Sequence, residues 1–298
     1  LISDFWLDRA EGKLNWSSAE RVEGKISQQI FTQAKKYSQQ GTCTNGCILV
    51  LHSTGDQVVG HFLANQEAWL TNAGYEPLNI IATIDFAGAG GGTDFADLAV
   101  GLVANESVPQ WIKSTIGSFL KLDLSSANYD DLGVVQDLTY SGARNISTQP
   151  NDIPRLRFSA NGGNTNPLKL LLSGHSDGVI PASSSCGASS PDAIDSCSNS
   201  LGYNGQQANR NGPSGLFYNH FPVLMSKHYD HNGIKDSKHK GTVTYVQNNF
   251  NAGIEVDFST YQKRIPWWQV WRETGTFQYV SKSDKQSMSE LIFNTFNN

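Results

Sequence analysis

Apolar and polar residues alternate along the chain in blocks that predict helices and buried strands in turn. Between Ser17 and Tyr37 the apolar residues recur every three or four positions, which is the period of one helical face. The runs Cys47-Ile-Leu-Val-Leu51 and Leu78–Phe86 are continuously apolar and of strand length, which is typical of strands covered on both faces. Gln57–Asn72, between them, returns to helical spacing. This order favours an α/β protein with a mostly parallel sheet flanked by helices.

The rest of the chain predicts more helices first and mixed elements later. Residues 98–140 contain amphipathic stretches at Trp111–Leu124 and Asp131–Tyr140, and we expect this region to form a helical lid over the sheet edge. Further strands are predicted at Arg155–Ser159, Leu168–Leu172 and Leu216–Met225. Residues 241–298 are expected to add antiparallel strands around Thr242–Val246 and Ile254–Phe258, and a closing helix at Ser281–Phe296. With no repeat or evident linker, residues 1–298 are interpreted as one domain.

The amino-acid composition indicates the compartment in which the protein works. The chain has 298 residues, and only 16% of them are charged, against about 25% in an average domain. Neutral polar residues therefore supply the solubility, which is typical of secreted proteins. The net charge of −5 and the lack of a basic run argue against nucleic acid as a partner. No apolar run reaches the 18 or so residues of a transmembrane helix. Because Leu1 is not an initiator Met and no signal peptide is visible, we expect a processed chain or a fragment of a longer one.

The four cysteines form two local pairs. Cys43 and Cys47 flank a short turn, and Cys186 and Cys197 flank a loop rich in Ser, Pro and Asp. An even count in close pairs predicts two disulfides, Cys43–Cys47 and Cys186–Cys197, in an oxidising compartment. The alternative is a four-cysteine metal site, although structural zinc usually takes pairs of cysteines with two residues between them.

Two stretches are candidates for the nucleophile elbow G-x-S-x-G, in which a strained turn between a strand and a helix exposes a serine. Gly174-His-Ser-Asp-Gly178 matches every letter, but a run of serines follows it instead of a helix. Leu51-His-Ser-Thr-Gly55 has Leu in place of the first Gly, yet a buried strand precedes it and a helix follows. We favour Ser53 over Ser176 as the nucleophile because the turn needs that context.

Candidates for the other two members of a Ser–Asp–His triad follow Ser53 in the chain order of α/β hydrolases. Asp177 lies on a loop beyond a predicted strand, and His228 follows another about fifty residues later. His231 is a second candidate three residues further on. In such a triad the Asp fixes the imidazole tautomer, and the His takes the proton from the attacking Ser.

Several stretches, in the same order along the chain, resemble secreted bacterial triacylglycerol lipases of the true-lipase type found in pseudomonads. The similarity extends over about residues 15 to 235. The stretches are Asn15-Trp-Ser-Ser-Ala-Glu-Arg-Val-Glu-Gly24, Leu49-Val-Leu-His-Ser-Thr-Gly55, Ala87-Gly-Ala-Gly-Gly-Gly-Thr-Asp-Phe-Ala-Asp97, Leu138-Thr-Tyr-Ser-Gly-Ala-Arg-Asn145 with Pro150, Asp177-Gly-Val-Ile-Pro-Ala-Ser-Ser184 and Lys227-His-Tyr-Asp230.

The resemblance implies an α/β-hydrolase fold and a secreted serine hydrolase that cleaves carboxylic esters, with lipids among its substrates. It implies Ser53, Asp177 and His228 as the triad, and so selects His228 over His231. The N–H of Thr54, the residue after the nucleophile, is expected to donate to the oxyanion. Two other functions remain as alternatives: a lipase-like binding or toxin protein with impaired catalysis, and an acyltransferase using the same triad.

The chain departs from this family in two places. Leu51 replaces the first Gly of the elbow, and no His-Gly pair precedes the first helix, where the family has a loop that supplies the second oxyanion donor. Losing one donor typically lowers the rate about 10²–10³-fold. Three explanations stay open: an upstream fragment of the same precursor that remains associated, an oxyanion hole built differently, or lost activity.

The remaining motifs receive simpler interpretations. No cofactor is expected; in the family, the residue equivalent to Asp230 helps to bind a structural Ca²⁺, but no matching upstream Asp is found here. Binding of a metal by His228, Asp230 and His231 is the less favoured interpretation. Gly88–Gly92 lacks the Lys of a phosphate-binding loop and is interpreted as a flexible loop. The tryptophans at 267, 268 and 271 are expected to pack in the core or on a sheet, with a sugar-stacking or membrane-facing patch as the alternative.

Overall fold

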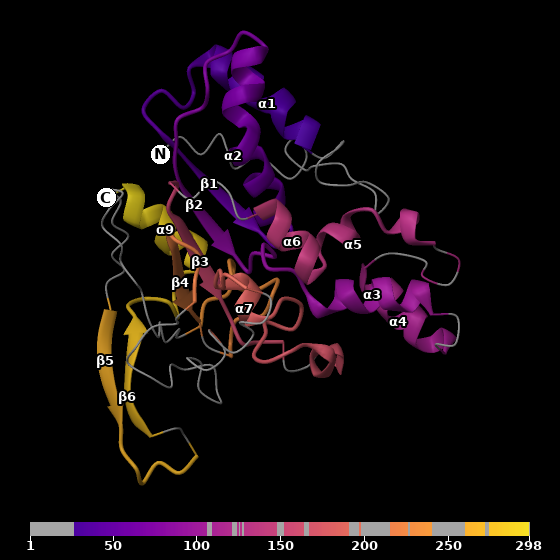
Figure 1. Ribbon diagram of the computed structural model, residues 1–298. Helices are drawn as coiled ribbons and strands as arrows, with labels where there is room; N and C mark the ends of the chain where they lie inside the picture. The colour runs from indigo at the N-terminus through magenta and orange to yellow at the C-terminus, as the bar shows by residue number, and fades with distance from the viewer. Residues whose placement is uncertain are drawn as a thin grey trace.

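The computed structural model describes residues 27–105, 109–120, 124, 126, 128–147, 152–163, 167–190, 197, 215–225, 227–239, 260–271 and 274–297. Four parallel strands form one sheet in the order β1–β2–β3–β4, so strand order follows chain order (Figure 1). Their bounds are β1 Cys47–His52, β2 Ile80–Phe86, β3 Arg155–Ser159 and β4 His220–Leu224. The parallel sheet flanked by helices confirms the predicted α/β-hydrolase-like fold.

Helices cover both faces of this sheet. Helix α2 packs on the sheet between α1 and α6, whereas α9 lies on the opposite face (Figure 1). The helices are α1 Ser27–Gln40, α2 Gly55–Asn72, α3 Asp94–Ala104, α4 Gln110–Leu120, α5 Val134–Asp137, α6 Tyr140–Ser147, α7 Ala182–Ser185 and α9 Met288–Asn297, with 3₁₀ turns η3 Tyr129–Leu132 and η4 Pro167–Leu171.

The face under α9 is apolar. The register of the strands aligns one row across it, which contains Val50, Ile84, Leu156 and Phe221. In the next row the rings of Phe86 and Phe158 stack with centroids 4.8 Å apart. Met288 and Ile292 of α9 pack against these side chains, so the alternate residues of each strand form one core with the last helix.

Helices α3, α4 and α5, between β2 and β3, share a second core to one side of the sheet in Figure 1. Ala96, Ala99 and Leu102 of α3 pack with Ile116 of α4 and with Val135 of α5. The prediction of helices in residues 98–140 is thus confirmed, and their role as a lid stays a prediction.

Three local predictions differ from the structure. The run Leu168–Leu172 is wrong as a strand, because Pro167 opens the 3₁₀ turn η4 and the turn leaves Leu170 exposed. The closing helix begins at Met288 rather than at Ser281, since a turn occupies residues 281–286. Gly88–Gly92 is buried rather than a flexible loop, and Gly91 has no room for a Cβ, which would lie 2.1 Å from Nη1 of Arg144.

The end of the chain contains a two-stranded antiparallel hairpin, β5 Thr260–Ile265 and β6 Gly275–Val280, which points away from the helical region (Figure 1). Antiparallel strands were expected here, but the segments 242–246 and 254–258 lie outside the described residues. The expectation that Trp267, Trp268 and Trp271 pack in the core is wrong, because β5 ends before Pro266 and the tryptophans lie in the exposed connection to β6.

Both predicted disulfides are present. Cys43 and Cys47 are joined with Cα atoms 5.1 Å apart, and Cys186 and Cys197 with Cα atoms 6.5 Å apart. The second disulfide directly follows α7, whose serines contact β3. Across the described ranges, no helix is both long enough and apolar enough to cross a membrane.

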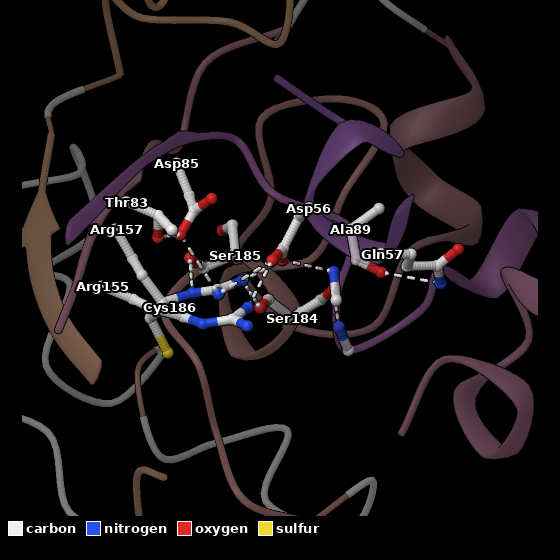
Figure 2. A network of polar contacts seen from close by, with 12 residues as sticks. Asp56, Gln57, Thr83, Asp85, Ala89, Arg155, Arg157, Ser184, Ser185 and Cys186 are labelled. Atoms are coloured by element: carbon white, nitrogen blue, oxygen red, sulfur yellow. Dashed lines mark hydrogen bonds and ion pairs between the residues drawn. The ribbon is translucent and has the colours of Figure 1, made fainter. Parts of the chain in front are cut away.

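The sheet face under α2 is charged where it meets the start of that helix. Asp56 of α2 points down onto β3, where its Oδ1 lies 3.2 Å from Nη1 of Arg155 (Figure 2). Arg157 donates to both carboxylate oxygens of Asp56 and lies 3.6 Å from Oδ2 of Asp85 on β2. All four side chains are fully buried, so two carboxylates and two guanidinium groups neutralise one another inside the protein.

The pKa values of the two carboxyl groups in this cluster are shifted in opposite directions. Burial acts to raise the pKa of Asp56, but the charges of Arg157 and Arg155 and the hydrogen bonds from Arg157 and Gly90 hold it below its usual range. Burial raises the pKa of Asp85 from 3.8 to about 6, and repulsion by Asp56 adds to the effect. At a pH between these two values, the folded protein holds a proton on Asp85 that the unfolded chain has lost. The contribution of Asp85 to the free energy of unfolding therefore increases as the pH falls through 6.

Replacing Asp56 with Asn should leave two buried guanidinium groups without their main counter-charge. We expect Asp56→Asn to lower the free energy of unfolding at neutral pH by about 3–5 kcal/mol, measured by urea denaturation. The matched control is Asp236→Asn, which removes a surface ion pair with Lys235 and should change it by less than about 1 kcal/mol. Equal effects of the two substitutions would contradict the importance of the buried pair.

Candidate active site

Ser53 lies at the turn between β1 and α2, and its backbone has a conformation that residues other than glycine rarely adopt. Its φ is +56°, in the left-handed region. Two hydrogen bonds to the main chain hold it there: its N–H donates to the carbonyl of Phe86, and its own carbonyl accepts from the N–H of Ala89 at 2.9 Å. A strained serine between a strand and a helix is the geometry of a nucleophile elbow.

Leu51 fits at the position where the elbow motif has its first glycine. A Cβ built on Gly55 would lie 3.9 Å from Cβ of Leu51, which is ordinary van der Waals contact. Leu51 itself is buried against α2 and belongs to the core that α1 and α2 form with β1. The turn therefore tolerates a large residue before the serine, and the departure from the motif does not disturb the elbow.

Ser53 is hydrogen-bonded to a histidine, and that histidine to an aspartate. Nε2 of His231 lies 2.9 Å from Oγ of Ser53, and Nδ1 of His231 lies 2.9 Å from Oδ2 of Asp177. The three side chains follow the carboxyl ends of β1, β3 and β4, where parallel α/β sheets place their functional residues. This is the linear arrangement of a nucleophile, a base and a group that orients the base.

The selection of His228 over His231 is corrected by this geometry. His228 is exposed, and its ring stacks on that of His239 with centroids 5.3 Å apart. Buried Tyr229 anchors the loop after β4, and the N–H of His231 donates to the carbonyl of Asp177 at 3.1 Å. These contacts turn the side chain of His231 inward. Both histidines were visible in the sequence, but the similarity of Lys227-His-Tyr-Asp230 to the family pattern selected His228, which the structure does not bring to Ser53 and Asp177.

Asp177 is fixed by the main chain of its own loop. Its Oδ1 accepts hydrogen bonds from the N–H groups of Val179 at 2.9 Å and Ile180 at 2.7 Å, which leaves Oδ2 for His231. Ser176, the rival nucleophile, is fully buried, and its hydroxyl has no hydrogen-bond partner among the residues that the structure describes. The structure thus places Ser53 at the strand-to-helix turn and in contact with His231, and it places Ser176 in the interior.

His52 belongs to the site as well, although no sequence motif assigned it a role. Its Nε2 lies 2.7 Å from the carbonyl oxygen of His231, and the two rings lie 4.8 Å apart. Burial lowers the pKa of His52 to about 4, and repulsion by the charged form of His231 adds to the shift. His52 is thus neutral at pH 7, and its Nε2–H donates to the backbone of His231 and holds it beside the elbow. The position of His52 directly before Ser53 was the feature of the sequence that could have identified it as a site residue.

Thr54 is the N-cap of α2, and its N–H lies beside Ser53. Within the residues that the structure describes, no hydrogen bond uses this N–H, so it is available to a ligand as the first-turn donor of a long helix. Residues 1–26, ahead of α1, contain no His-Gly pair and lie outside the described residues, so the source of a second oxyanion donor stays open.

Metal ligation is not evident in the described part of the chain. No three His, Cys, Asp or Glu side chains come together there as a metal site requires. Oδ1 of Asp230 accepts a hydrogen bond from the N–H of Gly233, which closes a turn. His231 is engaged by Ser53 and Asp177, so it does not join His228 and Asp230 as a ligand set. The calcium site at Asp230 stays a prediction.

No protein-family model matches the chain, and no curated protein sequence does. Among solved structures, the mature lipase BlEst2 of Bacillus licheniformis is similar over 54% of this chain and 60% of that one, at 14% identity and a TM-score of 0.36. The similarity thus spans less than two thirds of that lipase.

The protonation state of the His52 ring can be measured directly. In an NMR titration of the histidine rings, we expect the His52 signals to shift with a midpoint of about 4, because burial disfavours its charged form. The variant His52→Gln assigns the signals by their disappearance. A midpoint between pH 6 and 7, roughly the ordinary range, would show that the ring is not held neutral.

Proposed function

We propose that this protein is a serine hydrolase of carboxylic esters, of the lipase or esterase type, with Ser53 as the nucleophile. The observation that carries the proposal is the pair of 2.9 Å contacts that link Ser53 to His231 and His231 to Asp177. A lipase-like protein that only binds its target has no need of this alignment, so the geometry favours catalysis over the binding or toxin alternative.

The reaction would proceed by transfer of the acyl group to Ser53. With Nδ1–H donated to Asp177, Nε2 of His231 accepts the proton of Ser53 as Oγ bonds to the ester carbonyl carbon. The negative charge on the carbonyl oxygen falls beside the N–H of Thr54, which donates to it. His231 then gives its proton to the departing alcohol, and a water molecule repeats the sequence to release the acid. An alcohol in place of water would make the protein an acyltransferase.

The choice of ester and the compartment are part of the same proposal. We infer that lipids are among the substrates and that the true lipases of pseudomonads are relatives, because the motifs around Ser53 and Asp177 occur in the family's order. We infer secretion from the two disulfides and the low content of charged residues.

The nucleophile can be identified chemically. A fluorophosphonate probe should label Ser53 of the intact protein, located by peptide mass spectrometry. Ser53→Ala should lose both the label and hydrolysis of a short-chain nitrophenyl ester, with activity falling on the order of 10⁴-fold or more. Ser176→Ala is the matched control, because it removes a hydroxyl that makes no hydrogen bond in the described structure. Labelling at Ser176, or none at all, would refute the assignment.

The two histidines can be separated by a pair of substitutions. His231→Ala should abolish ester hydrolysis, since it removes the base that touches Ser53, whereas His228→Ala should leave kcat/KM unchanged. Thermal unfolding of both variants serves as the folding control. Loss of activity in His228→Ala with retention in His231→Ala would restore the assignment that the family resemblance suggested.

A further inference from the structure

The connection between β5 and β6 exposes a cluster of large apolar side chains. Trp267 is 77% exposed, Trp268 60%, Val270 84% and Trp271 75%. We call these four residues the hairpin tip. They lie at the far end of the hairpin, opposite the end that joins the rest of the molecule (Figure 1). Large exposed apolar groups gathered in one place usually mark an interaction surface.

The residue types indicate an interface between water and lipid. Indole rings combine a broad apolar face with a polar N–H, and tryptophan is enriched at the headgroup level of membranes for this reason. A projecting tip enters a fluid layer without needing a partner of complementary shape. Val270 is the most exposed of the four, and its aliphatic side chain gains only from burial in an apolar phase.

The charges next to the tip favour an anionic lipid surface. Lys263 and Arg264 lie on β5 just before the tip, and both are exposed. Residues 260–271 contain no Asp or Glu, although the whole chain carries a net charge of −5. The segment of β5 and the tip, residues 260–271, is therefore basic on an acidic protein, and basic residues beside an apolar anchor strengthen attachment to anionic lipids.

The arrangement of the rings argues against a sugar-binding platform. The planes of Trp267 and Trp268 are nearly perpendicular, at 81°, with centroids 6.1 Å apart. Neighbouring rings in this orientation do not form a flat surface on which successive sugar rings stack. Perpendicular rings enter a lipid layer equally well, because burial there does not depend on direction.

We propose that the hairpin tip inserts into the headgroup region of an anionic lipid surface and attaches the protein to it. Trp267, Trp268, Val270 and Trp271 supply the apolar contact, and Lys263 and Arg264 supply the attraction to the lipid charge. The attachment is separate from the candidate lid, since the hairpin and helices α3 and α4 point in different directions in Figure 1.

Vesicle binding tests this role. The full chain carrying Ser53→Ala, which cannot hydrolyse the lipid by the proposed mechanism, is sedimented with vesicles of phosphatidylcholine alone or mixed with phosphatidylglycerol. We expect binding to the mixed vesicles that weakens as salt is added. Adding Trp267→Ser, Trp268→Ser and Trp271→Ser together should weaken it on the order of tenfold or more. Lys263→Gln and Arg264→Gln should each weaken it about fivefold at low salt.

Trp111→Ser is the matched control, because Trp111 is also exposed, at 70%, but lies on α4 in the candidate lid. We expect the Trp111→Ser variant to bind vesicles as well as the parent protein, which is the full chain carrying Ser53→Ala. Circular dichroism verifies that every variant is folded. Brominated lipids give a second readout, since they should quench tryptophan fluorescence in the parent far more than in the triple variant.

Four results would overturn the proposal: no binding by the parent protein, equal binding by the triple variant, loss of binding in Trp111→Ser alone, or tip-dependent retention on insoluble cellulose without vesicle binding. Hydrolysis of a soluble nitrophenyl ester by the triple variant with Ser53 intact is a separate measurement. It should be unchanged, so a failure of the lipid proposal is distinguishable from a failure of the proposed catalysis.

Discussion

The carboxylate of Asp56 connects the turn that carries Ser53 to the sheet beneath it. It is buried with Arg155 and Arg157, and removing either kind of charge would leave the other unpaired in an apolar interior. The start of α2 must therefore stay above β3. The same carboxylate accepts a hydrogen bond from the N–H of Gly90, which brings the loop after β2 to the same point. One buried anion thus determines where a helix, a strand and a loop meet.

The candidate site depends on this meeting point through the main chain. The carbonyl of Ser53 accepts from Ala89 in the loop that Asp56 holds, so the strained conformation of the serine is supported from two sides. Asp177 and His231 lie on the loops that follow β3 and β4, and these two loops are hydrogen-bonded to each other directly. The parallel sheet brings the three loops to one edge, and the short-range hydrogen bonds then align the side chains.

Much of the fold was predictable because its signals are local. The buried strands at 47–51 and 78–86 and the helix between them follow from unbroken or periodic apolar runs, and the context of Ser53 followed from these elements. The choice between His228 and His231 was not predictable, because it depends on how a polar loop folds around Tyr229. The exposure of Trp267 was missed for a related reason: hydrophobicity predicts burial, and a turn beyond Ile265 overrides it.

Gln57 gives the candidate lid a fixed end. Its side-chain amide donates to the carbonyl of Asp137 at the end of α5 and to that of Ala89 beside the elbow, and both bonds are buried. Swinging α5 outward would break the bond to Asp137 and disturb the support of the nucleophile. Any opening motion that keeps the triad aligned is therefore confined to the outer part of the helical region, around α4. In such a motion α4 would pivot about the end of α5, which stays attached to the candidate active site.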